Sequence, residues 1–140
     1  MTRTLTFVAT ALLVAGCHNV ADLPRYKSEG VAQTYPVTLD EAWAITQAVF
    51  RWGGATAIEE HRAEGYMLTS SGDNLHGRGT VMGAWVEGVD ATHTRVIVVM
   101  RQRMRSNVLT PLTEATFHRR FAETVQSLRA ERPLPHAAPR

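Results

Sequence analysis

The chain has 140 residues, of which 44% are hydrophobic and 20% are charged, with a formal net charge of +2 and a single cysteine. This length and composition predict one globular domain with its own core and exclude a disulfide-stabilised scaffold. The charge is unevenly divided, since residues 1–94 carry a net −4 and residues 95–140 a net +6. Such asymmetry is typical either of a surface that meets an acidic partner or of charges that pair within one fold.

The first 16 residues have the layout of a secretory signal. Arg3 is followed by an apolar stretch, Leu5–Ala15, and by small residues that lead to Cys17. The stretch is about half of the roughly 20 apolar residues that a membrane-crossing helix needs, so no transmembrane anchor is expected. Cys17 has three candidate roles: a buried thiol, an intermolecular disulfide and a lipid attachment site. Its place at the end of a signal segment favours the lipid.

The residues Leu13-Val14-Ala15-Gly16-Cys17 resemble the lipobox of bacterial lipoprotein precursors. The resemblance implies cleavage between Gly16 and Cys17 and acylation of the Cys17 sulfur, and removal of residues 1–16 from the 140 leaves 124. More than one acyl chain holds such a protein stably on a bilayer. His18 stands where Asp favours inner-membrane retention in enteric bacteria, which indicates the outer membrane, facing the periplasm.

The segments that flank the expected domain, residues 31–131, are polar or proline-rich. Residues 17–30 contain Pro24 and show no apolar period, which predicts a flexible tether. Residues 132–140 predict a disordered tail. Between these segments, Val31–Val37 is a strand candidate that Pro36 confines to a sheet edge or to the end of the strand.

Two segments have helical signals. Thr38-Leu39-Asp40-Glu41 matches a capping box and predicts a helix from Leu39 to about Trp52, ended by Gly53-Gly54. Thr110-Pro111 predicts the start of a second helix. This helix has an apolar stripe that is expected to lie on a sheet: Phe117, Phe121, Val125 and Leu128.

Four further segments have strand patterns, at residues 55–61, 66–71, 80–87 and 94–105. In the last of these, Val96, Val98 and Met100 share one face, whereas four arginines share the other face with Ile97 and Val99: Arg95, Arg101, Arg103 and Arg105. The whole order, βαββββα, predicts an α+β fold. We expect a single antiparallel sheet of four to five strands with two helices packed on one face.

This order, together with Thr38–Trp43 and the long strand Thr94–Val99, is similar to that of small bacterial lipoproteins with domains of unknown function. It also resembles the globular domains of the lipoprotein accessory subunit of the outer-membrane barrel-assembly machinery. The resemblance covers roughly residues 31–130. It implies an envelope module that binds other proteins or stabilises a complex, and it brings no catalytic residue to this chain.

The sequence contains no complete motif for a metal, a nucleotide or a catalytic reaction. Glu114 and His118 are the only carboxylate and imidazole at i,i+4 on a predicted helix, a pair more typical of a surface contact than of a metal site. Asp73 and His76 lie in a turn-rich segment without a nucleophile elbow, which leaves an enzyme built on that loop as a minor hypothesis. We expect no enzymatic activity, no cofactor and no metal.

The row Arg101, Arg103 and Arg105 supports two interpretations. It could bind an anionic envelope component, or it could keep a sheet end soluble and discourage edge pairing. The leading hypothesis is a lipid-anchored, non-enzymatic interaction module. Its expected partners are the membrane, through Cys17, and an envelope protein, whereas nucleic acid is a poor partner for an exported protein. The sequence leaves the oligomeric state open.

Overall fold

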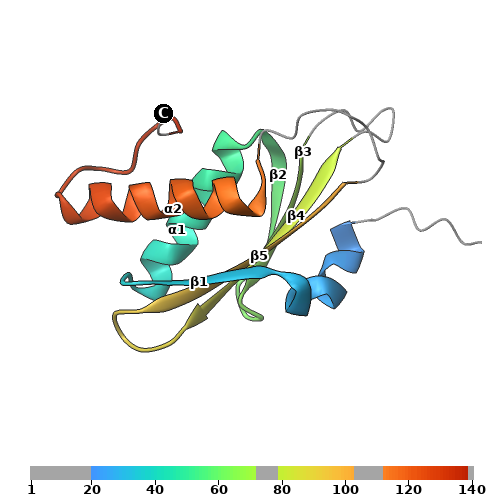
Figure 1. Ribbon diagram of the computed structural model, residues 1–140, viewed down its shortest axis with the longest axis horizontal. Helices are drawn as coiled ribbons and strands as arrows, with labels where there is room; N and C mark the ends of the chain where they lie inside the picture. The colour runs from blue at the N-terminus through green and yellow to red at the C-terminus, as the bar shows by residue number, and fades with distance from the viewer. Residues whose placement is uncertain (1–19, 72–78, 103–111, 139–140) are drawn as a thin grey trace, which may run out of the picture.

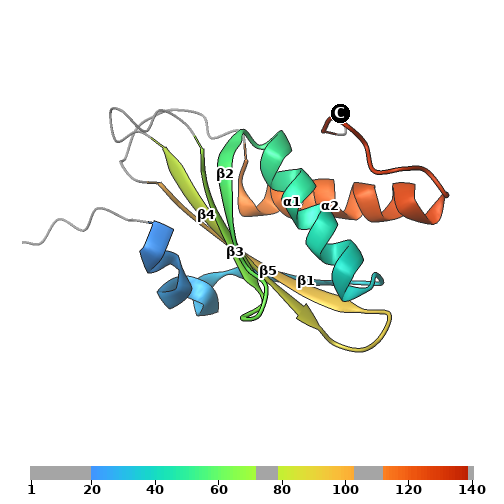
Figure 2. The same cartoon turned by 180° about the vertical axis from the view of Figure 1, so that it is seen from behind.

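A computed structural model describes residues 20–71, 79–102 and 112–138 (Figure 1). The elements in these ranges are η1 (Val20–Glu29), β1 (Val31–Tyr35), α1 (Leu39–Trp52), β2 (Ala55–His61), β3 (Tyr66–Ser71), β4 (Thr80–Gly88), β5 (Thr94–Gln102) and α2 (Glu114–Arg129). Five strands form one antiparallel sheet in the order β1-β5-β4-β3-β2. Both α-helices cover one face of it and η1 covers the other (Figures 1 and 2), so the predicted α+β fold is confirmed. None of the helices in these ranges has the length and apolarity to span a bilayer.

Helix α1 begins and ends where the sequence predicts. The Thr38 hydroxyl accepts a hydrogen bond from the Glu41 amide at 3.3 Å, and the Glu41 carboxylate accepts one from the Thr38 amide at 2.8 Å. This reciprocal pairing satisfies two amides that the first helical turn leaves without partners. Trp43 and Phe50 are buried in the core, as expected for apolar residues one heptad apart.

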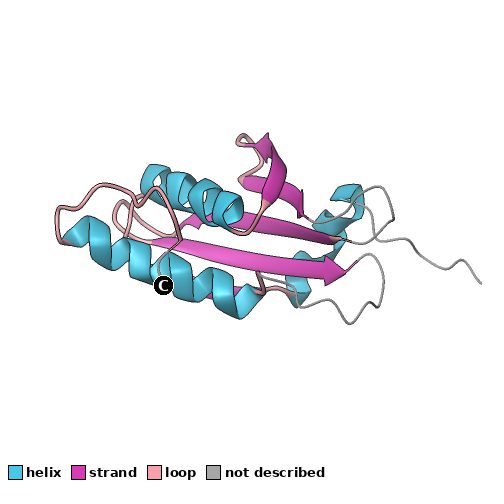
Figure 3. Ribbon diagram, turned by 90° about the horizontal axis from the view of Figure 1, so that it is seen from above, coloured by secondary structure: helices cyan, strands magenta, loops and turns pink. Residues whose placement is uncertain are grey.

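Helix α2 begins at Glu114, three residues after the predicted proline. The capping residue is Thr113, whose hydroxyl accepts from the Thr116 amide at 3.1 Å. The predicted start at Thr110-Pro111 was therefore wrong, and these two residues lie outside the described ranges. The predicted stripe is confirmed, because Phe117, Phe121 and Val125 are buried and Leu128 packs partly buried beside them. Figure 3 shows the helices and strands of the fold from above.

Strand β1 lies at one edge of the sheet, next to β5, as Pro36 suggested. It ends at Tyr35, two residues before the predicted end, because proline has no amide hydrogen to continue a strand ladder. The Tyr35 ring packs 4.3 Å from that of Phe121, between centroids, and so joins the edge strand to α2.

The other face of the sheet corrects the expectation of a flexible tether. The sequence predicts a flexible tether over residues 17–30, but Val20–Glu29 form a 3₁₀-helix that packs on this face, with Leu23 only 1% exposed. As a result β5 is covered on both sides, and Ile97 and Val99 are buried on one face as Val96 and Val98 are on the other. The face of β5 that carries Arg95 and Arg101 is therefore buried along Ile97 and Val99.

The C-terminal segment also differs in part from the expected disordered tail. Residues 132–138 have no regular secondary structure, as expected, but Leu134 packs partly buried against the main core. Burial of an apolar side chain holds this stretch near the helical layer.

Candidate functional site

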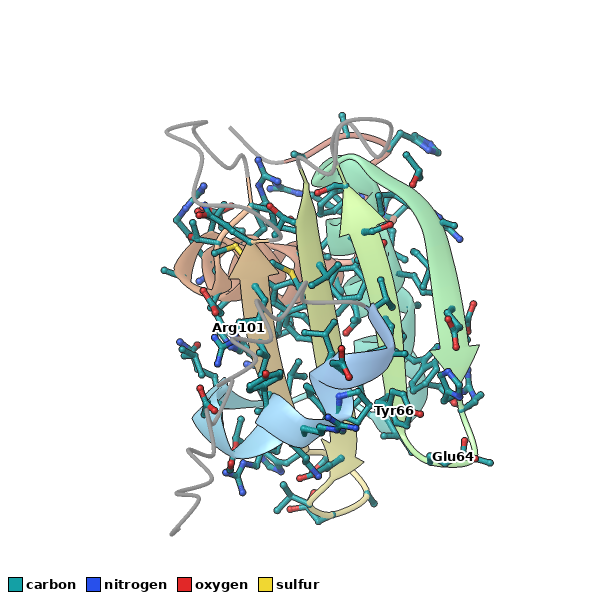
Figure 4. All side chains as sticks on the ribbon, turned by 90° about the vertical axis from the view of Figure 1, so that its right-hand side faces the viewer. Glu64, Tyr66 and Arg101 are labelled. Carbon is teal, nitrogen blue, oxygen red and sulfur yellow. The ribbon has the colours of Figure 1, made fainter. Side chains whose placement is uncertain are left out.

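Helix η1 is fastened to the sheet by apolar contacts and by ion pairs at its C-terminal end. Leu23 enters a small second core with Leu68, Val81, Trp85, Ile97 and Val99. Lys27 pairs with Glu87 of β4, and Glu29 pairs with Arg101 of β5. Figure 4 shows η1 crossing the strands, with Arg101 on the β5 side and Tyr66 on the β3 side. The helix is therefore an integral layer of the domain.

The spacing of the apolar residues explains why this segment forms a 3₁₀-helix. Val20, Leu23 and Tyr26 recur every three residues, and a helix with three residues per turn places them on one face. Gly30 then leads the chain into β1, and a Cβ at this position would lie 2.6 Å from a methyl group of Ile97. Only glycine lets the backbone approach β5 this closely.

Arg101 lies on the predicted face of β5, but its guanidinium is engaged inside the fold. It pairs with Glu29, and its central carbon lies 4.7 Å from the centre of the Tyr26 ring, in a cation–π contact. An external anion would have to compete with these contacts. Arg103 and Arg105, the other two residues predicted to bind an anion, lie outside the described ranges, as do Gly16 and Cys17.

An open groove of about 500 Å³ runs beside η1, between this helix and the strands β1, β4 and β5. Three cationic side chains and one carboxylate line it: Arg25, Lys27, Arg95 and Glu87. Sequence analysis singled out none of these as a site. The signal that could have indicated this groove is the three-residue spacing of the apolar residues in η1. A 3₁₀-helix packed by these residues places Arg25 and Lys27 on the sheet face that Arg95 shares with Arg101.

The cations of the groove differ in how far they are neutralised. Lys27 is paired with Glu87, and Arg25 lies 3.6 Å from Asp22 with 80% of its side chain exposed. Arg95 stands opposite Glu87 in the strand register. In the described part of the chain no hydrogen bond or ion pair is made by the Arg95 guanidinium, which leaves all of its donors available.

A second polar cluster is buried where α2 meets β1. His118, 2% exposed, donates from Nε2 to the Val31 carbonyl at 2.8 Å and accepts at Nδ1 from the Tyr35 hydroxyl at 2.8 Å. The side-chain oxygen of Gln33 lies 2.9 Å from the same hydroxyl. Nε2 must carry a proton because a carbonyl only accepts, and in the neutral ring Nδ1 is then the acceptor for the Tyr35 hydroxyl.

Burial governs the pKa values in this cluster. Desolvation lowers the pKa of His118, and the hydrogen bond to Val31 and the charge of Glu114 oppose it only in part. Burial likewise raises the pKa of Tyr35 above its ordinary value. The pair predicted as a surface contact is thus divided: His118 is buried against β1, whereas the Glu114 carboxylate accepts from the Met100 amide of β5 at 2.9 Å.

The remaining candidate groups are spread over the surface. Glu59 and His61 lie 2.6 Å apart on one face of β2, whereas Glu60 accepts from the Trp43 indole at 2.8 Å on the other. Asp90 accepts hydrogen bonds from Thr92 and His93 in the β4–β5 turn, which lowers its pKa to about 2. Among the described residues no three His, Cys, Asp or Glu side chains form a metal-binding group, and Asp73 and His76 lie outside those ranges.

No family model matches the chain, and neither does any curated protein.

Proposed function

We propose that the protein is a cell-envelope lipoprotein, anchored by acyl chains on Cys17, whose domain is a non-enzymatic interaction or accessory module. The observation that carries the proposal is the run Leu13–Cys17 at the end of a short apolar segment. The first described element begins at Val20, three residues after Cys17, so an anchor at Cys17 would present this domain at a membrane surface. His18 after the cysteine supports an outer-membrane location facing the periplasm.

The fold also bears on the alternative, an anion site on the arginine-rich strand. Arg101 already has Glu29 and Tyr26 as partners, so it is a weak candidate for an external ligand. A protein partner fits the described surface better, since large exposed apolar side chains occur at Leu39 and Val89. These two positions lie at the same end of the domain, where the Thr94 hydroxyl bonds the Val37 carbonyl at 2.9 Å.

The anchor is tested by the intact mass of the protein from the membrane fraction of a bacterial host. We expect a chain that begins at Cys17 and carries a diacylglyceryl group, because the thiol at this position is the lipid acceptor of the motif. Cys17→Ala should remove both the added mass and the cleavage. Gly16→Ala is the matched control, since the motif accepts either small residue, and it should be processed as wild type. An unmodified wild-type chain that keeps residues 1–16 would refute the anchor.

The interaction role is tested by photo-crosslinking in intact cells. A photoreactive side chain at Val89, which is 59% exposed, should give a discrete adduct with one envelope protein. The matched control is the same side chain at Thr56, an exposed residue of β2 at the opposite end of the sheet. No adduct from either position, or equal smears from both, would contradict a module that binds a specific partner.

A further inference from the structure

We propose that the groove beside η1 binds the headgroup phosphate of an anionic phospholipid, and that the η1 face is therefore the membrane-facing side of the domain. The orientation rests on the proposed anchor at Cys17, whereas the groove does not need it. The residues that would contact the phosphate are Arg25, Lys27 and Arg95.

The groove has the chemistry and the access that a headgroup requires. Its lining of three cations and one carboxylate gives a local net charge of +2. Arginine binds phosphate oxygens through two parallel N–H donors, and the Arg95 guanidinium has no partner among the described residues that would have to be displaced. Lys27 is held in place by Glu87, which fixes its ammonium group at the groove wall.

Apolar and aromatic groups border the basic groove. Ile97 contributes to its floor, and Pro24 of η1 is exposed at its rim. Tyr26 of η1 and Tyr66 of β3 lie partly buried on the same sheet face. Tyrosine suits the membrane interface because its ring is apolar and its hydroxyl is polar. The face thus combines the two kinds of contact that a bilayer surface offers.

The short distance along the chain from Cys17 to η1 indicates that the η1 face lies nearest the membrane. Three residues of fully extended chain reach at most about 10 Å, so an acylated Cys17 would hold Val20 close to the headgroups. Helix η1 is fastened to the second face of the sheet, away from α1 and α2 (Figure 2). The helical layer then points away from the bilayer, and the groove lies on the near side.

The test is sedimentation of residues 18–140, which contain every described element, with lipid vesicles. We expect this unacylated chain to bind vesicles of phosphatidylglycerol and phosphatidylethanolamine but not vesicles of phosphatidylcholine alone. Arg25→Gln with Arg95→Gln should weaken binding about 25-fold, since one basic residue near an anionic surface contributes a factor of about five. Lys27 is left in place because it fastens η1 to Glu87.

The matched control removes the same charge elsewhere, with Arg51→Gln and Arg132→Gln, two exposed residues outside the groove. It should bind as wild type. Equal losses in both double variants, or no loss in the groove variant, would overturn the proposal. Displacement from vesicles by 10 mM inorganic phosphate at constant ionic strength would show a site for the free ion and overturn the lipid assignment. Because residues 18–140 do not include Cys17, the vesicle experiment tests the groove independently of acylation.

Discussion

Leu23→Ala is expected to lower the free energy of unfolding by about 3 kcal/mol, a large effect for a residue in a segment without α-helix or strand. Leu23 is 1% exposed and is the only fully buried side chain of η1. Truncating a buried leucine removes its transfer free energy and leaves a cavity, which costs about 2–5 kcal/mol. Urea denaturation of residues 18–140 measures the loss.

Leu39→Ala is the matched control, because the same truncation at a residue that is 46% exposed removes little buried area. We expect a change below about 1 kcal/mol for it. A second readout separates undocking of η1 from general loosening of the domain. Trp85 lies 4% exposed in the cluster that Leu23 enters, so acrylamide should quench tryptophan fluorescence more strongly in Leu23→Ala. Equal stability of the two variants would show that η1 contributes nothing to the fold.

Acidification is expected to destabilise the domain through His118. Burial lowers the pKa of this imidazole, so below about pH 6.5, the ordinary value for histidine, the unfolded chain binds a proton that the folded chain does not. Stability is therefore complete above pH 6.5 and decreases as the pH falls towards the lowered pKa. One such group changes the free energy of unfolding by up to about 1.4 kcal/mol per pH unit. Urea denaturation between pH 7.5 and 5 measures this slope.

The groups around His118 support this direction. Tyr35 and Gln33 face it from β1 and are both uncharged in this range, and Glu114 on α2 offsets the effect of burial only in part. His118→Gln should flatten the pH dependence, whereas His61→Gln, at a partly exposed histidine beside Glu59, should not flatten it in the same way. If wild type and His118→Gln lose stability in parallel, the buried imidazole is not the acid-sensitive group.

The sequence predicted those helices and strands whose ends are determined by residues close together in the chain. The capping box at Thr38–Glu41 set the start of α1, and Gly53-Gly54 set its end. The hairpin of β2 and β3 also has the predicted bounds, with Gly65 at a φ of +76° in the connecting turn. In each case the residues that define the element lie within one turn or one hairpin of each other.

The layer formed by η1 could not be recognised from an α-helical or alternating period. Its apolar residues, Val20, Leu23 and Tyr26, follow a period of three, and Pro24 between them is more typical of a linker. Helix η1 also covers the second face of β5, which was not predicted. Ile97 and Val99 indicate a second buried surface along β5 without indicating what covers it.

The candidate site was only partly predictable for the same reason. Alternation along β5 placed Arg95 and Arg101 on one face correctly. Their different roles depend on Glu29 and Tyr26, which are about 70 residues earlier in the chain and contact Arg101. A pairing over that separation depends on the tertiary fold, so the sequence grouped the arginines by spacing and could not distinguish the engaged one from the free one.

The position of β1 beside β5 has a consequence for the order in which the chain folds. The β2–β3 and β4–β5 hairpins close short loops, whereas Tyr35 pairs with Thr94, 59 residues later. Long closures cost more chain entropy and form more slowly, so we expect β1 to join an existing sheet late. Helix η1 immediately precedes β1, and until both have docked, Leu68, Trp85 and Val99 remain exposed to water. Cleavage near Gly30 would leave this surface uncovered permanently, so a truncated chain should aggregate where the intact one stays monodisperse.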